Sequence, residues 1–449
     1  MALVGISMET TQSTVSYRRN TFILTALLML ATWNYLDRAA IGILQEPIKR
    51  EFGLSDFQLG LLGGPAFAFL YVILGFPFAR LAERYNRVRI IAMVFAFWSL
   101  MTALCGAATS FIMLLLARAA VSIGEAGCTP SAHSVIADQF PLHRRPWALA
   151  VYSSGLSLGA LCAALAGGAI AQRLGWRATF YVLGATGLIF AFLFPLVVPE
   201  PPRTTAVEST PSFGRTLRFL VGQPIIRHIV AGTMVGGLMG YSMTQYMTSF
   251  FIRTHGLAIG HATPRVALIA GAAGAAGTWL GGLVGNRLER RRRGAAALAA
   301  AWGFFFSLPL LFVGFLIPDV NTATVLLMIG TASQLCYFGP AFALLHAAAE
   351  PRMRATAIAV VLLMTNLVGY GVGPPLVGAA SDALARLLQL KTPTILQLCA
   401  NSSWLDQACQ SPNAGGLQWS LAALALANLW AFYHFIKVSR YAANDPGLA

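Results

Sequence analysis

The sequence predicts an all-α membrane protein that crosses the bilayer twelve times and folds as two halves of six helices each. Three observations predict this fold class. Of the 449 residues, 57% are hydrophobic and only 10% are charged; the apolar residues form runs long enough to span a bilayer; and one loop motif recurs six helices later. Soluble globular domains usually carry roughly a quarter charged residues, so the composition excludes a soluble protein.

A hydrocarbon core about 30 Å thick requires roughly 20 apolar residues per helix. Charged and Pro/Gly-rich breaks divide the chain into twelve such runs. We predict spans at 20–44, 57–79, 88–109, 111–137, 147–172, 176–197, 224–252, 265–286, 295–317, 322–349, 355–387 and 417–437. The domains are then an N-terminal tail (1–19), an N-terminal bundle (20–197), a linker that begins Pro-Glu-Pro-Pro (198–223), a C-terminal bundle (224–437) and a C-terminal tail (438–449).

The net charge of +15 indicates topology rather than a nucleic-acid partner. Of the 31 basic residues 28 are arginines, and they cluster in short loops without the interleaved aromatic residues of a nucleic-acid surface. With a cytoplasmic N-terminus, 21 bases fall on the inside and 8 on the outside, which leaves Arg38 and Arg118 within helices. The positive-inside rule therefore predicts cytoplasmic termini, and we expect an integral protein of a bacterial inner membrane.

The loop motif that recurs lies after the second and the eighth spans. Residues 82–87 read Ala-Glu-Arg-Tyr-Asn-Arg and residues 285–290 read Gly-Asn-Arg-Leu-Glu-Arg, the same Arg-x-x-Arg frame. Two matched six-helix halves are typical of secondary transporters, which bind substrate between the halves. The alternative is that each arginine pair arose independently as a topology signal.

Three segments resemble motifs of the major facilitator superfamily and, within it, of the Spinster family of lipid transporters. They are Asn34-Tyr35-Leu36-Asp37-Arg38, Glu83-Arg84-Tyr85-Asn86-Arg87, and Arg118 through Gly124-Glu125-Ala126. Ala79, Glu83 and Ser122 depart from the family pattern of Gly, Asp and Gly. The resemblance covers essentially the whole chain. It implies alternating access and an amphipathic, anionic lipid such as a sphingolipid or lysophospholipid.

Four charged residues fall deep within the predicted spans: Asp37, Arg38, Arg118 and Glu125. A charge at the bilayer centre costs about 2.5 to 3.5 kcal/mol, so these residues need partners or water. Arg118 and Glu125 share a helix face but lie about 10.5 Å apart along the axis, too far for a direct bond. One interpretation is a salt-bridge lattice that only joins two helices. Because the tenth span has no equivalent acid, we favour proton coupling by Glu125 and Asp37, and substrate binding by Arg38 and Arg118.

Glu83, Arg84 and Arg87, with Asp138 at the inner end of the fourth span, resemble the charge relay of the superfamily. The resemblance implies a cytoplasmic gate between the two halves. The alternative interpretation is that these are solvated topology charges without a mechanical role.

Two cysteines, Cys399 and Cys409, lie ten residues apart in the predicted outside loop before the last span. That compartment is oxidising if the topology holds, so we predict a disulfide. Two free thiols in the same loop are the alternative.

Aromatic residues in the spans, including Tyr35, Tyr337 and Tyr370, provide surface for an acyl or sphingoid chain, and we predict that these three line the substrate site. Aromatic residues at helical spacing are also common in plain helix packing. The predicted function is proton-linked transport of a lipid-like anion; the alternative is proton-coupled transport of small organic anions or drugs.

No sequence pattern indicates a cofactor, a metal site or an enzyme. The six cysteines form no C-x-x-C pair and have no His/Cys ligand spacing, and no Walker-type loop is present. The expected partners are therefore the substrate, protons and membrane lipids.

Overall fold

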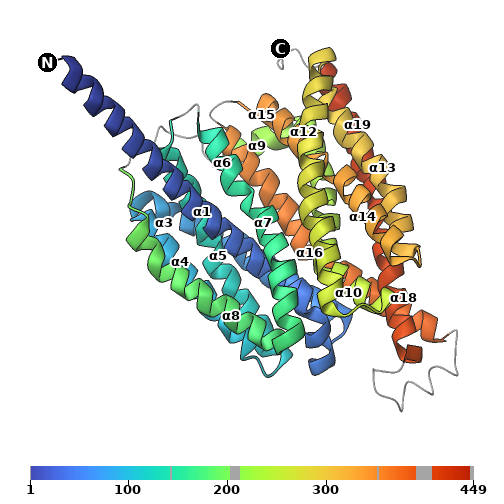
Figure 1. Ribbon diagram of the computed structural model, residues 1–449. Coiled ribbons are helices and arrows are strands. Elements are labelled where there is room, and N and C mark those ends of the chain that lie inside the picture. Colours follow the sequence, from blue (N-terminus) through green and yellow to red (C-terminus); the bar gives the residue numbers. More distant parts are fainter. Residues whose placement is uncertain (1, 142–143, 203–212, 351–352, 391–406, 445–449) are drawn as a thin grey trace.

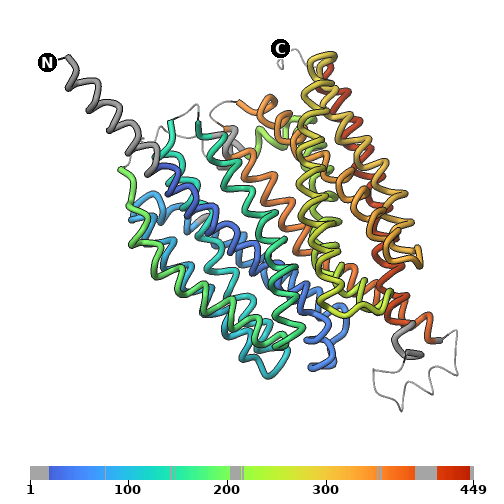
Figure 2. Tube along the Cα trace, in the orientation of Figure 1, coloured from blue at the N-terminus to red at the C-terminus, as the bar shows by residue number. Residues whose placement is uncertain are grey.

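The computed structural model describes residues 2–141, 144–202, 213–350, 353–390 and 407–444, and these ranges contain helices but no strand (Figures 1 and 2). The helices of the N-terminal half are α1 (Ala2–Phe52), α2 (Asp56–Gly63), α3 (Pro65–Arg84), α4 (Arg87–Gly106), α5 (Phe111–Gln139), α6 (Arg145–Ser153), α7 (Gly155–Cys162), the π-helical η1 (Ala163–Gly167) and α8 (Gly168–Val197).

The second half follows a linker that contains α9 (Phe213–Gly222). Its helices are α10 (Pro224–His255), α11 (Ile259–Val266), the π-helical η2 (Ala267–Ala273), α12 (Gly274–Arg291), α13 (Ala296–Leu316), α14 (Val320–Leu335), α15 (Phe338–Ala348), α16 (Arg354–Leu390), α18 (Gln407–Leu424), the 3-10 turn η3 (Ala425–Ala427) and α19 (Asn428–Asn444).

All twelve predicted spans lie on these helices. Within the described ranges, nine helical stretches are long and apolar enough to cross a membrane. One of them, Trp147–Val197, contains two predicted spans, because the chain turns at Gly175 with φ 85°. The first and seventh predicted spans lie on α1 and α10 and are not among the nine; polar residues such as Asp37 and Gln245 lower their hydropathy.

Local side-chain caps explain where several helices begin. The Asn86 Oδ1 atom accepts the Arg89 N–H at the start of α4, and Ser110 Oγ accepts the Met113 N–H at the start of α5. Asp319 caps α14 in the same way through the Thr322 N–H. Such side chains satisfy helix N–H groups that otherwise have no partner.

The predicted linker is partly helical, since α9 lies within 198–223 and packs against α10 and α16. Residues 203–212 lie outside the described ranges. Cys399 and the side chain of Cys409 lie outside them too, so the disulfide between these cysteines stays a prediction.

The two halves form two bundles that meet along specific helix pairs. Contacts between them join α1 to α10, α2 and α3 to α16, α7 to η2, and α8 to α11. The end of α19 lies at the upper end in Figure 1, called the termini end here. The opposite end, called the far end, contains the turn between α1 and α2 and the start of α18.

The hydrophobic core is continuous between the bundles only toward the far end. One cluster combines residues of the N-terminal bundle with far-end residues of the C-terminal bundle, such as Tyr246 and Phe250. A second cluster, which includes Ile229 and Val438, belongs to the C-terminal half alone and lies toward the termini end. The bundles are therefore packed together at the far end and have separate cores toward the termini end.

Candidate functional site

A buried ion pair joins the first and fourth predicted spans. The Nε atom of Arg38 on α1 lies 2.5 Å from Oε2 of Glu125 on α5, and the two side chains are 7% and 0% exposed. These residues are 87 positions apart in the sequence. A buried pair of this kind is costly to break from one side, because the remaining charge is left without a partner.

The other two predicted charges form a second pair beside the first. Arg118 Nη1 lies 3.5 Å from Asp37 Oδ2, and Thr102 Oγ1 donates a hydrogen bond to Asp37 Oδ1 at 3.0 Å. Arg118 is only 1% exposed. The four charges are therefore paired crosswise between α1 and α5, with Arg38 to Glu125 and Arg118 to Asp37.

Each carboxyl group also has one oxygen without a hydrogen-bond partner. Asp37 Oδ2 and Glu125 Oε1 are buried and accept no hydrogen bond within the described structure. An ionised carboxylate can only accept a hydrogen bond, whereas a protonated one can also donate. These two oxygens are therefore the places in the charge cluster where a proton can be added.

Three aromatic rings of the N-terminal bundle surround the Arg38 guanidinium, and a ring of the second bundle packs against one of them. Its central carbon lies 5.0 Å from the ring centre of Tyr35, 4.7 Å from Phe67 and 4.6 Å from Tyr71. Tyr370 on α16 contacts Phe67 at 5.6 Å between ring centres. The predicted Tyr35 and Tyr370 thus reach the site, and α16 brings the second bundle to it. We call Tyr35, Phe67, Tyr71 and Tyr370 the aromatic box.

Tyr337, also predicted for the substrate site, lies in the core of the C-terminal bundle. Its ring is 4% exposed, and its neighbours are Phe304 at 5.1 Å, Phe435 at 6.2 Å and Phe338 at 6.0 Å between ring centres. None of its ring contacts in the described structure is with Arg38 or the aromatic box. The structure therefore gives Tyr337 a packing position.

Of the predicted cytoplasmic gate residues, Arg87 and Asp138 come together. Arg87 at the start of α4 is 1% exposed and pairs with Asp138 on α5. Its Nε also donates to Glu200 Oε1 at 2.7 Å, and its Nη2 to the Pro201 carbonyl at 2.9 Å. Sequence analysis missed Glu200, which lies just beyond α8. All of these partners of Arg87 belong to the N-terminal bundle or its exit, so in this conformation Arg87 ties three helix ends of one bundle together.

Glu83 and Arg84 stay near the surface at the end of α3. Glu83 pairs with Arg80, one turn earlier, at 3.5 Å, and both side chains are more than half exposed. Arg84 is exposed as well. The structure therefore does not unite Glu83 and Arg84 with the buried Arg87 cluster.

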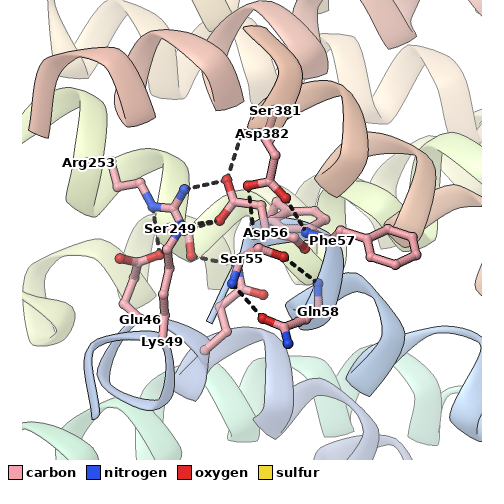
Figure 3. A network of polar contacts seen from close by, with 12 residues as sticks. Glu46, Lys49, Ser55, Asp56, Phe57, Gln58, Ser249, Arg253, Ser381 and Asp382 are labelled. Carbon is pink, nitrogen blue, oxygen red and sulfur yellow. Dashed lines mark hydrogen bonds and ion pairs between the residues drawn. The ribbon is translucent and has the colours of Figure 1, made fainter. Parts of the chain in front are cut away.

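A polar network that sequence analysis missed joins the bundles at the far end (Figure 3). Arg253 on α10 donates to Glu46 at 2.7 Å and to both Asp56 carboxylate oxygens at 2.7 and 2.9 Å. Lys49 contacts the same Asp56 at 2.5 Å. Glu46, Lys49 and Asp56 belong to the first bundle, whereas Arg253 belongs to the second.

Asp382 on α16 adds a second connection between the bundles. The N–H groups of Asp56 and Phe57, at the first turn of α2, donate to the two Asp382 carboxylate oxygens at 2.9 Å each. Ser381 Oγ donates to Asp56 Oδ2 at 2.6 Å. A carboxylate on a helix N-terminus is favoured by hydrogen bonding and by the helix dipole. We call Glu46, Lys49, Asp56, Arg253, Ser381 and Asp382 the interbundle network.

The backbones approach closely around this network. A Cβ added at Gly60 would lie 2.6 Å from the Pro374 carbonyl oxygen, and one at Gly378 would lie 2.2 Å from the Asp56 carbonyl oxygen. Tyr246 Oη donates to the Asp56 carbonyl at 2.7 Å. The far end is therefore closed by direct packing of α2 against α16 and α10.

One signal could have pointed to this network. Lys49 and Arg253 are basic residues on the side where the charge count is low, and acids stand near them at helix ends. The counting rule treats such bases as topology charges, so their pairing was not predicted.

The fold and these sites together define a polytopic membrane transporter, with a buried charge site inside the N-terminal bundle and a closed seam between the bundles at one end. The chain belongs to the Major Facilitator Superfamily, whose family model matches residues 21–374. It is an integral multi-pass membrane protein, and membership of this transporter family confirms the expectation that it is not an enzyme.

Within this superfamily the chain is similar to an efflux pump and to Spinster proteins, which makes it Spinster-like. It is 34% identical to an MFS-type efflux pump of Mycolicibacterium smegmatis, over 85% of this chain and 91% of that protein. It is 28% identical to protein spinster homolog 1 of Rattus norvegicus, over 83% of this chain and 75% of that protein. The crystal structure of a bacterial homologue of the human lysosomal transporter Spinster, inward-facing and unoccupied, matches with TM-score 0.87 and 31% identity, over 95% of this chain and 99% of that one.

Proposed function

We propose that this protein moves an amphipathic, anionic, lipid-like substrate across a bacterial inner membrane by proton-linked alternating access. In this proposal the bundles are residues 20–197 and 224–437, and both termini are cytoplasmic. The observation that carries the proposal is the buried Arg38–Glu125 pair inside the aromatic box, to which both bundles contribute.

The chemistry of the pair supports linkage between protons and substrate. Arginine keeps its proton under all working conditions, so Arg38 is a permanent anchor for an anion. An anionic headgroup at this place competes with the Glu125 carboxylate. A proton on Glu125 removes this competitor and the repulsion between the two anions. Asp37, whose Oδ2 is buried without a hydrogen-bond partner in the same charge cluster, is a second group that can hold a proton.

The aromatic box and the similarity to the Spinster relatives support the proposal of a lipid-like substrate. Aromatic rings around a single cationic anchor suit a molecule with one anionic group and an apolar chain. The alternative, transport of small organic anions or drugs, is favoured by the identity to the mycobacterial efflux pump. Counterflow in proteoliposomes separates the two: a lysophospholipid or sphingoid phosphate exchanges in the first case, and only small anions or drugs exchange in the second.

The two ends of the protein have different roles in this cycle. The interbundle network closes the far end, which faces outside if the termini are cytoplasmic, so this is the inward-facing state of the cycle. Glu83, Arg84, Arg87 and Asp138 lie at the termini end, where they are placed to hold the bundles together when the far end opens. That gate remains part of the proposal.

A reporter fused after Ala449 should be active only if it needs the cytoplasm, because the segments predicted on the side of the termini hold 21 basic residues and those on the other side hold 8. A matched fusion in the far-end turn at Leu257, between α10 and α11, should give the opposite result. Activity of a periplasmic reporter at Ala449 would reverse the assignment of both gates.

Glu125→Gln should fold, bind the substrate and transport it at the same rate with and without a pH gradient. Glutamine is close in size and neutral, so it mimics the protonated acid permanently and cannot titrate. The measurement is lysophospholipid counterflow and gradient-driven uptake in proteoliposomes. Glu51→Gln is the matched control, because Glu51 is a far-end surface partner of Arg177 and should leave the gradient response intact. An unaltered gradient response in Glu125→Gln would place the coupling elsewhere, with Asp37 as the next candidate.

A further inference from the structure

The turn between α12 and α13 at the termini end carries an excess of positive charge. Arg287 and the run Arg290 to Arg293 are exposed. In the described part of the chain, none of these five arginines forms an ion pair with a carboxylate. Their charges are therefore available to a ligand outside the protein.

The one acid within this turn, Glu289, is already occupied. Its Oε1 accepts the Gly294 N–H and its Oε2 accepts the Ala296 N–H, each at 2.8 Å. One oxygen thus accepts from the turn just before α13 and the other from the first residue of α13, where helix N–H groups need acceptors. Glu289 shapes the turn and leaves the neighbouring arginines without a carboxylate partner.

The turn is held against the last helix. Gly294 has φ 71°, a conformation that side chains disfavour, and a Cβ there would lie 2.6 Å from the Ser439 carbonyl oxygen on α19. This close approach brings the turn beside Arg440, which is also exposed. We call Arg287, Arg290, Arg291, Arg292, Arg293 and Arg440 the basic rim.

One exposed tyrosine of α19, Tyr441, is next to Arg440 in the sequence near the end of the helix, and a second, Tyr433, lies about two turns earlier. Tyr433 is 52% exposed and Tyr441 is 41% exposed. Tyrosines at helix ends commonly sit at the level of lipid headgroups. The rim therefore belongs to the part of the protein that meets the headgroup layer.

The matching loop of the other half uses its charges differently. There Arg87, which corresponds to Arg290 in the repeated frame, is buried against Asp138 and Glu200, and Arg80 pairs with Glu83. A topology signal alone would leave the two loops alike. Arg84 and Arg89 are exposed there without an ion pair in the described structure, against five such arginines in the turn between α12 and α13, so the larger excess of unpaired charge lies in the C-terminal bundle.

We propose that the basic rim binds the phosphate headgroups of anionic membrane phospholipids at the termini end of the C-terminal bundle. Clusters of four to eight basic residues directly beside membrane helices attract anionic lipids. Arginine also offers several N–H donors in a geometry that matches phosphate oxygens. This site is separate from Arg38 and does not depend on the substrate or on proton coupling.

The test is a titration of the purified full-length protein with phosphatidylglycerol, followed by native mass spectrometry. Arg291→Gln/Arg292→Gln should raise the dissociation constant roughly 25-fold, since each basic residue contributes about a fivefold gain. Arg89→Gln/Arg144→Gln is the matched control: it removes two exposed arginines from the N-terminal bundle and should change binding little. Arg291→Lys/Arg292→Lys keeps the charge and should retain most of the affinity.

Two further measurements, a titration with phosphatidylcholine and a competition with inorganic phosphate, identify the kind of ligand that the basic rim binds. Phosphatidylcholine, which has a phosphate but no net charge, should bind equally weakly to all variants. Inorganic phosphate should not displace phosphatidylglycerol at matched concentration. Equal phosphatidylglycerol binding by the wild type and Arg291→Gln/Arg292→Gln would overturn the proposal, as would displacement by inorganic phosphate. An unchanged thermal unfolding curve for the double glutamine variant verifies that the rim, and not the fold, was altered.

Discussion

Arg38→Ala is expected to abolish substrate binding and transport together. The substitution removes the cationic anchor from the aromatic box and leaves Glu125, which is 0% exposed, without its charge partner. Removing one member of a buried pair costs about 3 to 5 kcal/mol of folding stability. The lost hydrogen bonds from the guanidinium to the anion contribute about 1.5 to 3 kcal/mol, so a loss of anion affinity of roughly 10- to 100-fold is expected. Equilibrium binding of a lysophospholipid probe and counterflow in proteoliposomes are the measurements.

Two variants separate binding from folding in this experiment. Arg38→Ala/Glu125→Gln removes both charges and should recover the thermal stability lost in Arg38→Ala, but not the binding. Arg177→Ala breaks a pair at 2.5 Å whose side chains are 34% and 44% exposed; such surface pairs contribute less than about 1 kcal/mol, and binding should persist. Wild-type affinity in the stabilised double variant would show that Arg38 is not the anchor.

Arg253→Met should shift the protein from the far-end-closed conformation toward the opposite one. In the closed state the substitution leaves Glu46 and Asp56 buried without Arg253, at a cost of about 3 to 5 kcal/mol. When the bundles separate, water solvates the same carboxylates and the cost disappears. The equilibrium should therefore move by roughly 100-fold or more. Pulsed electron resonance distances between spin labels across the far end would measure the populations.

The matched control for this shift is Arg177→Met, which removes an arginine at the far end within one bundle and should leave the distance distribution unchanged. Glu46→Gln/Lys49→Met/Asp56→Asn/Arg253→Met, which removes all four of the charges that form ion pairs around Asp56, should return toward the wild-type distribution. An Arg253→Met protein with the wild-type distribution would mean that the interbundle network does not set the conformational balance.

The pairing of the charged residues illustrates what sequence reasoning can reach. The cost of burying charge singles out Asp37, Arg38, Arg118 and Glu125 without any structure. The partner of each is not encoded in local spacing, because Arg38 and Glu125 are 87 residues apart. Helical periodicity predicts that Arg118 and Glu125 share one face of α5. The packing of α1 against α5 then determines the pairs, Asp37 with Arg118 and Arg38 with Glu125.

The roles of the aromatic residues and the contacts between the bundles could not be predicted from the sequence pattern. A tyrosine in an apolar helix has the same local pattern whether it faces a site, as Tyr370 does, or a core, as Tyr337 does. Charge counting assigns Lys49 and Arg253 to a membrane side but says nothing of Asp56, which they share across two bundles. Such contacts depend on how the bundles pack.

The sequence by itself determined the helical membrane fold, its spans and its buried charges, because bilayer thickness and the cost of charge in hydrocarbon act on each segment separately. The tertiary structure alone decided the crosswise ion pairs, the burial of Arg87 within one bundle, the closed far end and the unpaired arginines of the basic rim. These features join residues from different helices, often more than 80 positions apart, and only the packing of the helices brings such residues within hydrogen-bonding distance.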